Sequence, residues 1–112
     1  MPPYEYATEW IASWNARDVD AVLAHYADDV VLRSPTAAAV VPESGGVIVG
    51  RDALRTYWTT ALAQLPDLHF ELDGVFASVT GLTILYRNER GRQITETLRF
   101  NPARQVDEVL VG

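Results

Sequence analysis

The fold is decided by residues 14–35, which read WNARDVDAVLAHYADDVVLRSP. Asp18 is a good helix N-cap, because its carboxylate can accept a hydrogen bond from a free backbone N–H of the first turn. Apolar residues then recur with the i, i+3, i+4 and i+7 spacing of one helical face, at Val19, Val22, Leu23 and Tyr26. A β-rich run follows and is closed by Pro35. The stretch predicts a helix over 18–26 that leads directly into a strand over 30–34 and packs on the sheet this strand joins.

The composition indicates one globular domain over residues 1–112, since 48% of the residues are apolar. A net charge of −6 argues against nucleic acid as a partner, because phosphate binding needs a basic face. No apolar run is long enough to span a membrane, and the first residues do not resemble a signal peptide. The chain has no cysteine, so neither disulfides nor thiolate metal sites are expected, and the expected compartment is the cytoplasm.

The rest of the chain predicts two more helices and five more strands. A helix over 4–15 would carry Tyr6, Trp10 and Trp14 on one stripe, and a helix over 52–65 would be capped by Asp52 and stopped by Pro66. Strands are expected near 47–49, 67–76, 79–88, 93–101 and 105–111. Three helices among six strands predict an α+β fold, in which a curved sheet is closed on one side by helices.

Residues 36–46 are predicted to be a loop. They are mostly small and apolar, with Pro42 and the pair Gly45-Gly46. The segment is long for a connection in a compact domain, which is typical of a mobile lid at a binding site. A plain surface excursion explains the same residues equally well.

Glu96 is the most informative single residue. It shares its strand face with Ile94, Leu98 and Phe100, the apolar face that should look toward the helices. A carboxylate there is costly unless it is paired, hydrogen-bonded or protonated, and loss of water raises its pKa. The pattern favours equally an acid used by a pocket and a structural acid bonded to a tryptophan N–H or a tyrosine hydroxyl.

No other arrangement of residues indicates chemistry. The two histidines, His25 and His69, are both predicted to point outward, so no metal site is suggested. The sequence has no nucleophile elbow and no glycine-rich phosphate loop, and no cofactor is expected. Asp28-Asp29 fits a turn better than a catalytic pair.

Three segments resemble a known superfamily: NARDVDAVLAHYADDVVLRSP, GRDALRTYW and TETLRFN. They are similar to nuclear-transport-factor-2-like proteins, above all to SnoaL-like polyketide cyclases and ketosteroid isomerases. The resemblance covers nearly the whole chain. It implies a cone-shaped, curved mixed β-sheet of about six strands, packed against three helices and enclosing a pocket. Members of this superfamily commonly form homodimers.

The resemblance to ketosteroid isomerase also implies roles for individual positions. Ser34 stands where that enzyme has its catalytic base, and a serine hydroxyl cannot serve as that base unaided. Trp10 and Trp58 stand in place of two active-site tyrosines. Glu96 stands where the enzyme has a protonated aspartate that stabilises an oxyanion. The chain therefore has a glutamate in place of the oxyanion aspartate and a serine in place of the base. The loss of the base argues against steroid isomerase activity.

The expected pocket is apolar and aromatic, which suits a hydrophobic small-molecule ligand. Its candidate catalytic residues are Glu96, as the acid, and Ser34. Its candidate substrate-binding residues are Trp10, Trp14, Tyr26, Leu32, Trp58, Leu62, Phe70 and Leu98.

Three functions are compatible with this pocket. The first is a cofactor-free acid/base enzyme with Glu96 as the proton carrier or as a neutral hydrogen-bond donor. The second is a binding module without chemistry, and the third is an assembly domain whose core is filled. The fold does not decide among them, because one fold can host many functions.

A homodimer is expected through the outer faces of the long strands. The alternation assigns Leu85, Val109 and Val111 to these faces, and a face in contact with water would not need them. Arg87 and Arg99 would pair with carboxylates such as Glu71 or Asp107 in the contact.

Overall fold

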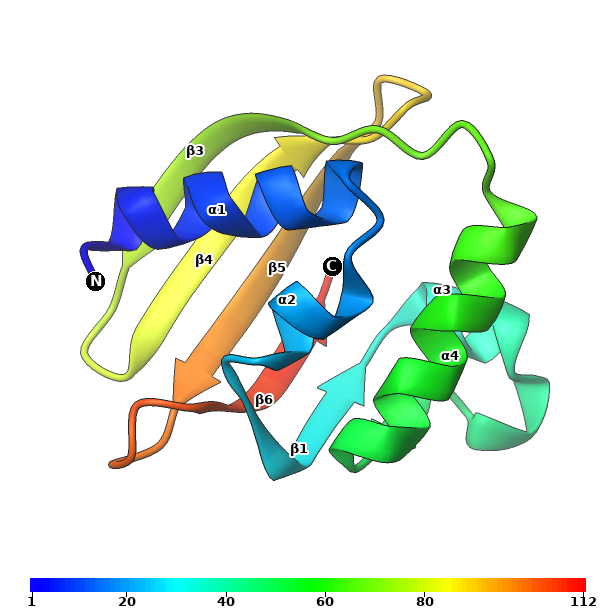
Figure 1. The fold of residues 1–112 in the computed structure, drawn as a ribbon, viewed down its shortest axis with the longest axis horizontal. Coiled ribbons are helices and arrows are strands. Elements are labelled where there is room, and N and C mark those ends of the chain that lie inside the picture. Colours follow the sequence, from blue (N-terminus) through cyan, green and yellow to red (C-terminus); the bar gives the residue numbers. More distant parts are fainter.

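The computed structural model describes residues 1–112 and contains four α-helices, one 3-10 helix and six strands (Figure 1). The helices are α1 Pro3–Asn15, α2 Val19–Leu23, α3 Pro35–Val40, η1 Pro42–Ser44 and α4 Arg51–Gln64. The strands are β1 Tyr26–Arg33, β2 Val47–Val49, β3 Glu71–Ala77, β4 Gly81–Arg87, β5 Gln93–Phe100 and β6 Val106–Val111. The predicted α+β class is confirmed, and no helix follows α4. None of the helices is long and apolar enough to cross a membrane.

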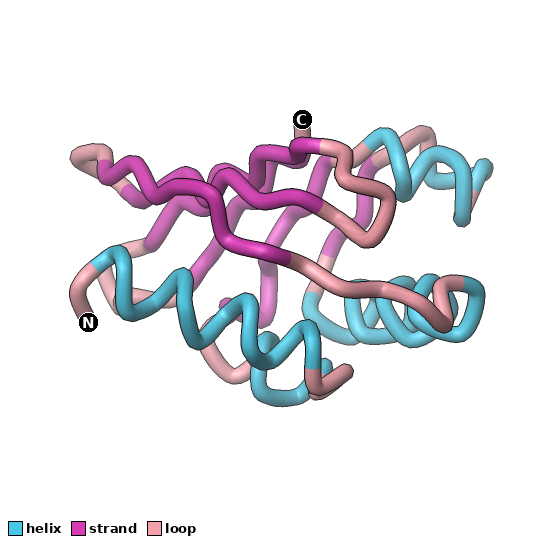
Figure 2. Tube along the Cα trace, turned by 90° about the horizontal axis from the view of Figure 1, so that it is seen from above, coloured by secondary structure: helices cyan, strands magenta, loops and turns pink.

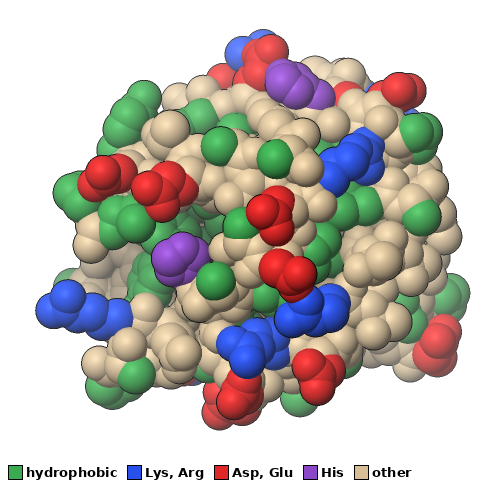
Figure 3. Space-filling view, in the orientation of Figure 1, with side chains coloured by type: hydrophobic (Ala, Val, Ile, Leu, Met, Phe, Trp, Pro, Cys, Tyr) green, Lys and Arg blue, Asp and Glu red, His purple; other side chains and the backbone are tan.

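All six strands form one curved sheet in the order β2-β1-β6-β5-β4-β3. Strands β1 and β6 pair in parallel and every other pair is antiparallel, so the sheet is mixed. Figure 2 shows a layer of helices beneath one face of the sheet. Acidic and basic side chains are scattered over the helical side of the molecule (Figure 3). Two ion pairs lie there: Arg51 pairs with Asp28 and Arg55 pairs with Asp20.

The segment over residues 14–35 folds as predicted at its start and differs from the prediction at the end of its helix. The Asp18 carboxylate accepts a hydrogen bond from the backbone N–H of Ala21 at 3.0 Å, which confirms the N-cap. The helix ends at Leu23, however, and Tyr26 begins β1 instead of ending the helix. The backbone is already hydrogen-bonded to the sheet at residue 25, since the N–H of Val106 donates to the carbonyl of His25 at 2.8 Å.

The prediction of a loop over residues 36–46 is wrong, because most of this segment forms α3 and η1. Ser34 is the N-cap of α3, and its hydroxyl oxygen accepts the N–H of Thr36 at 3.1 Å. Pro35 then occupies the first helical position, where its missing N–H costs nothing. A serine followed by a proline is thus a signal for the start of a helix. The prediction of a loop rests on the small side chains of residues 36–46 and leaves this signal out. Helix α4 likewise begins after Gly50, and Asp52 lies in its first turn instead of capping it.

The strand predicted from residue 67 begins only at Glu71. The intervening segment is attached to the end of α1 instead of pairing with a strand. The Asn15 side-chain amide donates to the carbonyl of Phe70 at 2.9 Å and accepts its N–H at 2.8 Å. Arg17 donates to the carbonyls of Leu62 and Leu65. These contacts hold the chain after α4 over one end of the sheet.

The two faces of the sheet differ strongly. The inner face packs on the helices and carries fully buried Ile84, Leu98 and Val109. The assignment of Val109 and Val111 to the outer face is wrong, because they pair with inward-facing Leu98 and Glu96 and so point inward as well. Leu110 takes their place on the outer face, opposite Thr97.

Two arginines of the outer face, Arg87 and Arg99, find carboxylates within their own chain. Arg87 contacts Glu71 at 3.2 Å and Asp73 at 3.0 Å, and Arg99 contacts Asp107 at 2.9 Å. These are the kinds of partner that the sequence suggested for a contact between subunits. Because they are satisfied inside one chain, the arginines do not need a second copy to neutralise them.

Candidate functional site

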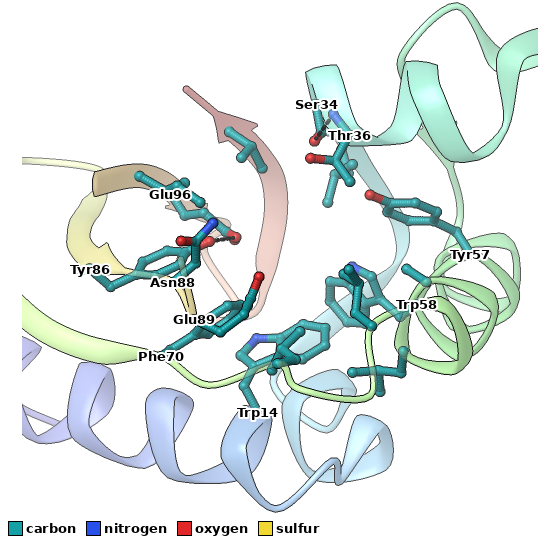
Figure 4. Close-up of a pocket in the computed structure, with 17 residues that line it drawn as sticks. Trp14, Ser34, Thr36, Tyr57, Trp58, Phe70, Tyr86, Asn88, Glu89 and Glu96 are labelled. Carbon is teal, nitrogen blue, oxygen red and sulfur yellow. Dashed lines mark hydrogen bonds between the residues drawn. The ribbon is translucent and has the colours of Figure 1, made fainter. Parts of the chain in front are cut away.

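A cavity of about 140 Å³ lies between the inner face of the sheet and helices α1 and α4. Twelve of its 17 lining residues are hydrophobic, and they come from every layer of the fold. Figure 4 shows Glu96, Tyr86 and Asn88 on one wall, Ser34, Thr36 and Tyr57 on the opposite wall, and Trp14 below them. The cavity is therefore an apolar space with polar groups at two ends.

Strand β5 places Glu96 in the cavity wall. Its neighbours alternate inward and outward, so a residue between Ile94 and Leu98 on the same face must point toward the helices. Glu96 is only 8% exposed, and the Tyr86 hydroxyl donates a hydrogen bond to its Oε1 at 2.8 Å. Tyr86 lies diagonally across the strand pair, since Glu96 is paired with Ile84. Diagonal neighbours on one face are within reach of long side chains.

Burial raises the pKa of the Glu96 carboxyl from 4.5 to about 7, and the hydrogen bond from Tyr86 opposes this shift in part. No lysine, arginine or histidine lines the cavity, so no cation holds the carboxyl ionised. Burial also raises the pKa of Tyr86 far above its ordinary value, and the nearby Glu96 carboxylate adds to this. Tyr86 therefore stays protonated and serves only as a hydrogen-bond donor, and Glu96 is neutral in a large fraction of molecules at neutral pH.

The opposite wall offers hydroxyl groups only. Ser34 is buried, and its oxygen is engaged by the N–H of Thr36 in the cap of α3. Burial raises the pKa of Tyr57 to about 12, with the Ser34 side chain lowering it and Glu96 raising it. No group on this wall can act as a base near neutral pH, because serine, threonine and a tyrosine of raised pKa all stay protonated.

Seven of the ten candidate site residues line this cavity together. They are Glu96, Ser34, Trp14, Leu32, Trp58, Leu62 and Phe70. Trp10, Tyr26 and Leu98 do not line it, so their assignment to the pocket is wrong. The Trp10 indole N–H donates to the Tyr26 hydroxyl at 3.2 Å, and both side chains fill the core beside the cavity. Leu98 has no exposed surface and belongs to the same hydrophobic core.

Sequence reasoning missed several residues of the cavity wall. Tyr86 and Tyr57 could have been found, because Tyr86 shares the inward face with Ile84 and Tyr57 lies on the apolar stripe of α4. Asn88 and Glu89 belong to the turn between β4 and β5, which gave no such signal. The Asn88 carboxamide oxygen accepts the N–H groups of Arg90 and Arg92, both at 3.0 Å, and so fixes the turn at the rim. The other lining residues not expected there are Thr36, Ala61, Leu65, Leu68, Ile94 and Val111.

Comparisons with known proteins agree with this architecture. A SnoaL-like protein of unknown function from Burkholderia thailandensis is 38% identical, with a TM-score of 0.92 over 98% of this chain and 92% of that chain. A computationally designed 17-OHP binder shares the fold at 22% identity and a TM-score of 0.72, over 99% of this chain and 89% of the other. TerC co-crystallised with polyporic acid also shares the fold, at 12% identity and a TM-score of 0.75, over 99% of this chain and 91% of the other.

No curated protein matches the sequence. The sequence model of the SnoaL-like domain matches residues 7–105, which is most of the chain. The superfamily resemblance drawn from the sequence is thereby confirmed. The chain belongs to the SnoaL-like domain family.

Proposed function

We propose that the cavity binds a small, uncharged hydrophobic molecule and that neutral Glu96 donates a hydrogen bond to an oxygen atom of this ligand. One observation carries the proposal: a carboxyl group is buried in the wall of an apolar cavity with a tyrosine as its partner and no cation beside it. Such a group costs folding free energy, so its position favours a use for the site.

The chemistry that this arrangement supports is polarisation of a carbonyl group. A neutral carboxylic acid in a low-dielectric cavity stabilises negative charge that develops on a carbonyl oxygen. The Tyr86 hydroxyl donates a hydrogen bond to Oε1 of the same carboxyl group and so holds it in position. A C–H bond next to that carbonyl then loses its proton more easily, with water as the acceptor. The reaction would be a cofactor-free proton transfer in which Glu96 acts as the general acid.

Deuterium exchange into 2-tetralone, a bicyclic ketone, tests this proposal. In D₂O the protein should accelerate exchange of the protons next to the carbonyl, and Glu96→Gln should slow this exchange by roughly 100-fold, the usual range for general acid catalysis. Glu43→Gln, which changes an exposed carboxyl outside the cavity, is the matched control and should exchange as the wild type does. Equal exchange rates in the wild type and in Glu96→Gln would contradict the catalytic role.

The alternative proposal is a binding protein without chemistry. The state of Ser34 favours it, because this residue stands, by resemblance, where ketosteroid isomerase has its base, and its hydroxyl oxygen is engaged as a helix cap. The fold also occurs in a designed 17-OHP binder and in a protein co-crystallised with polyporic acid, which supports a ligand-binding role. Saturable binding of 2-tetralone without faster exchange would favour this alternative, and no binding at all would favour an assembly domain.

We also propose a homodimer formed by the outer face of the sheet. Leu110 is 43% exposed and Phe76 61% exposed on this face, and the Thr83–Thr97 pair lies between them. Leu85 lies two residues further along β4 on the same face. Exposed apolar side chains on a sheet face are typical of a protein contact. Leu110→Glu should therefore convert a dimer into a monomer in light scattering at micromolar concentrations. A monomeric wild type would contradict the dimer.

A further inference from the structure

The indole N–H of Trp14 is a buried hydrogen-bond donor without a partner. The side chain is 6% exposed and lines the cavity, and its Nε1 contacts no acceptor. The Trp10 indole, one helical turn away, donates instead to the Tyr26 hydroxyl. Nearly all buried donors in folded proteins are paired, because an unpaired one costs its full desolvation energy. The unpaired Trp14 donor therefore indicates an acceptor that the folded chain itself does not provide.

Aromatic packing holds this donor in place. The Trp14 ring lies edge-on to Trp58, with ring centres 4.7 Å apart, and it also contacts Trp10 at 6.0 Å and Phe70 at 6.1 Å. In Figure 4 the indole forms the lower wall of the cavity, with its nitrogen on the side turned toward Phe70 and Glu89. Because three rings confine it, the indole cannot turn to find another acceptor. Its N–H therefore keeps one direction, on the side of the indole that faces Phe70 and Glu89.

The charges of the wall restrict what that group can be. Two carboxyl groups, Glu96 and Glu89, line the cavity, and no basic side chain does. The Glu89 carboxyl forms no hydrogen bond or ion pair within the chain, although Arg90 and Arg92 are its neighbours in the turn. An anionic ligand would meet these carboxyl groups in an apolar space with no cation to compensate for its lost hydration. The acceptor must then belong to a molecule without negative charge.

We propose that the Trp14 indole N–H donates a hydrogen bond to an oxygen of an uncharged ligand, such as a carbonyl oxygen, and so selects it over the matching hydrocarbon and the matching carboxylate. This inference rests on the proposed ligand-binding role of the cavity. A carbonyl oxygen has two lone pairs, so a bond from Trp14 does not compete with one from Glu96.

Three ligands of similar shape and two variants test this proposal by calorimetry. The ligands are 2-tetralone, its hydrocarbon analogue tetralin, and the anion 2-naphthoate. The wild type should bind the ketone more tightly than either of the others. Trp14→Phe should weaken ketone binding roughly fivefold to tenfold, the value of one neutral hydrogen bond, and leave tetralin binding within about twofold. Trp10→Phe removes an indole N–H that is engaged in the core, so it should keep the preference for the ketone.

Proton NMR of the wild type decides the question even if a variant does not fold. The Trp14 Hε1 resonance should move downfield when 2-tetralone binds and should not do so with tetralin. Ketone binding without this shift, or an equal loss of ketone and tetralin affinity in Trp14→Phe, would overturn the inference and leave the binding cavity intact. Failure of all three ligands to bind would instead overturn the proposed function together with this inference.

Discussion

Glu96→Gln should gain about 3 kcal/mol of stability relative to the wild type when the pH is raised from 4 to 8. Burial raises the pKa of Glu96 from 4.5 in the unfolded chain to about 7 in the folded one, so the folded state binds this proton more tightly. The stabilisation from that proton is fully present below pH 4.5 and is lost as the pH rises through 7. Glutamine keeps the shape of the side chain and does not ionise, so this decline disappears.

Urea denaturation at a series of pH values measures this effect. Between pH 4.5 and 7 the free energy of unfolding of the wild type should fall by about 1.4 kcal/mol per pH unit from this group, and that of Glu96→Gln should lack this component. Glu43→Gln again serves as the control, since its carboxyl is exposed. A wild type and a Glu96→Gln variant with parallel pH profiles would show that the buried carboxyl stays ionised in the folded protein.

Gly81→Ala should lower the free energy of unfolding by about 3 kcal/mol, which corresponds to a melting temperature lower by roughly 10–20 °C. A Cβ atom at Gly81 would lie 1.8 Å from the carbonyl oxygen of Leu98 and 3.0 Å from the Cα of Arg99. Both contacts are to backbone, which cannot move aside as a side chain can. The methyl group would therefore separate β4 from β5, the two strands that carry Tyr86 and Glu96.

Gly91→Ala is the matched control for this steric effect. Gly91 lies in the turn between the same two strands, with a φ of +74° and no atom within 4 Å of an added Cβ. Its substitution should cost only the strain of the left-handed backbone, about 1 kcal/mol. Thermal unfolding followed by circular dichroism compares the two variants. Equal losses of stability would show that close contact between β4 and β5 does not explain the need for glycine at residue 81.

The sequence was sufficient to predict the sheet and the orientation of its buried acid. Period-two alternation around Glu96 depends only on backbone geometry, so it could place the carboxyl on the inner face without knowledge of the neighbouring strands. Its partner could not be predicted in the same way. The bond from Tyr86 depends on the register of β4 against β5, which a turn at Asn88 and Gly91 sets.

The same limit explains the errors about the aromatic residues. Trp10 and Trp14 share one stripe of α1, and a helical period cannot tell which of them fills the core and which borders empty space. That difference is made by distant residues. Tyr26 engages the Trp10 indole, whereas Asn15 and Arg17 hold the segment around Leu65 and Phe70 over the cavity beside Trp14. Predicting the site therefore needs tertiary contacts that no local pattern contains.

The titration of the Glu96 carboxyl by carbon-13 NMR tests the central claim most directly. Comparison with Glu96→Gln assigns the resonance, and the other acidic residues in the same spectrum provide internal references. A neutral acid in the cavity wall requires a pKa of about 7 for Glu96, raised by burial. A value near 4.5, that of the unfolded chain, would contradict the claim and remove the basis for Glu96 as a general acid.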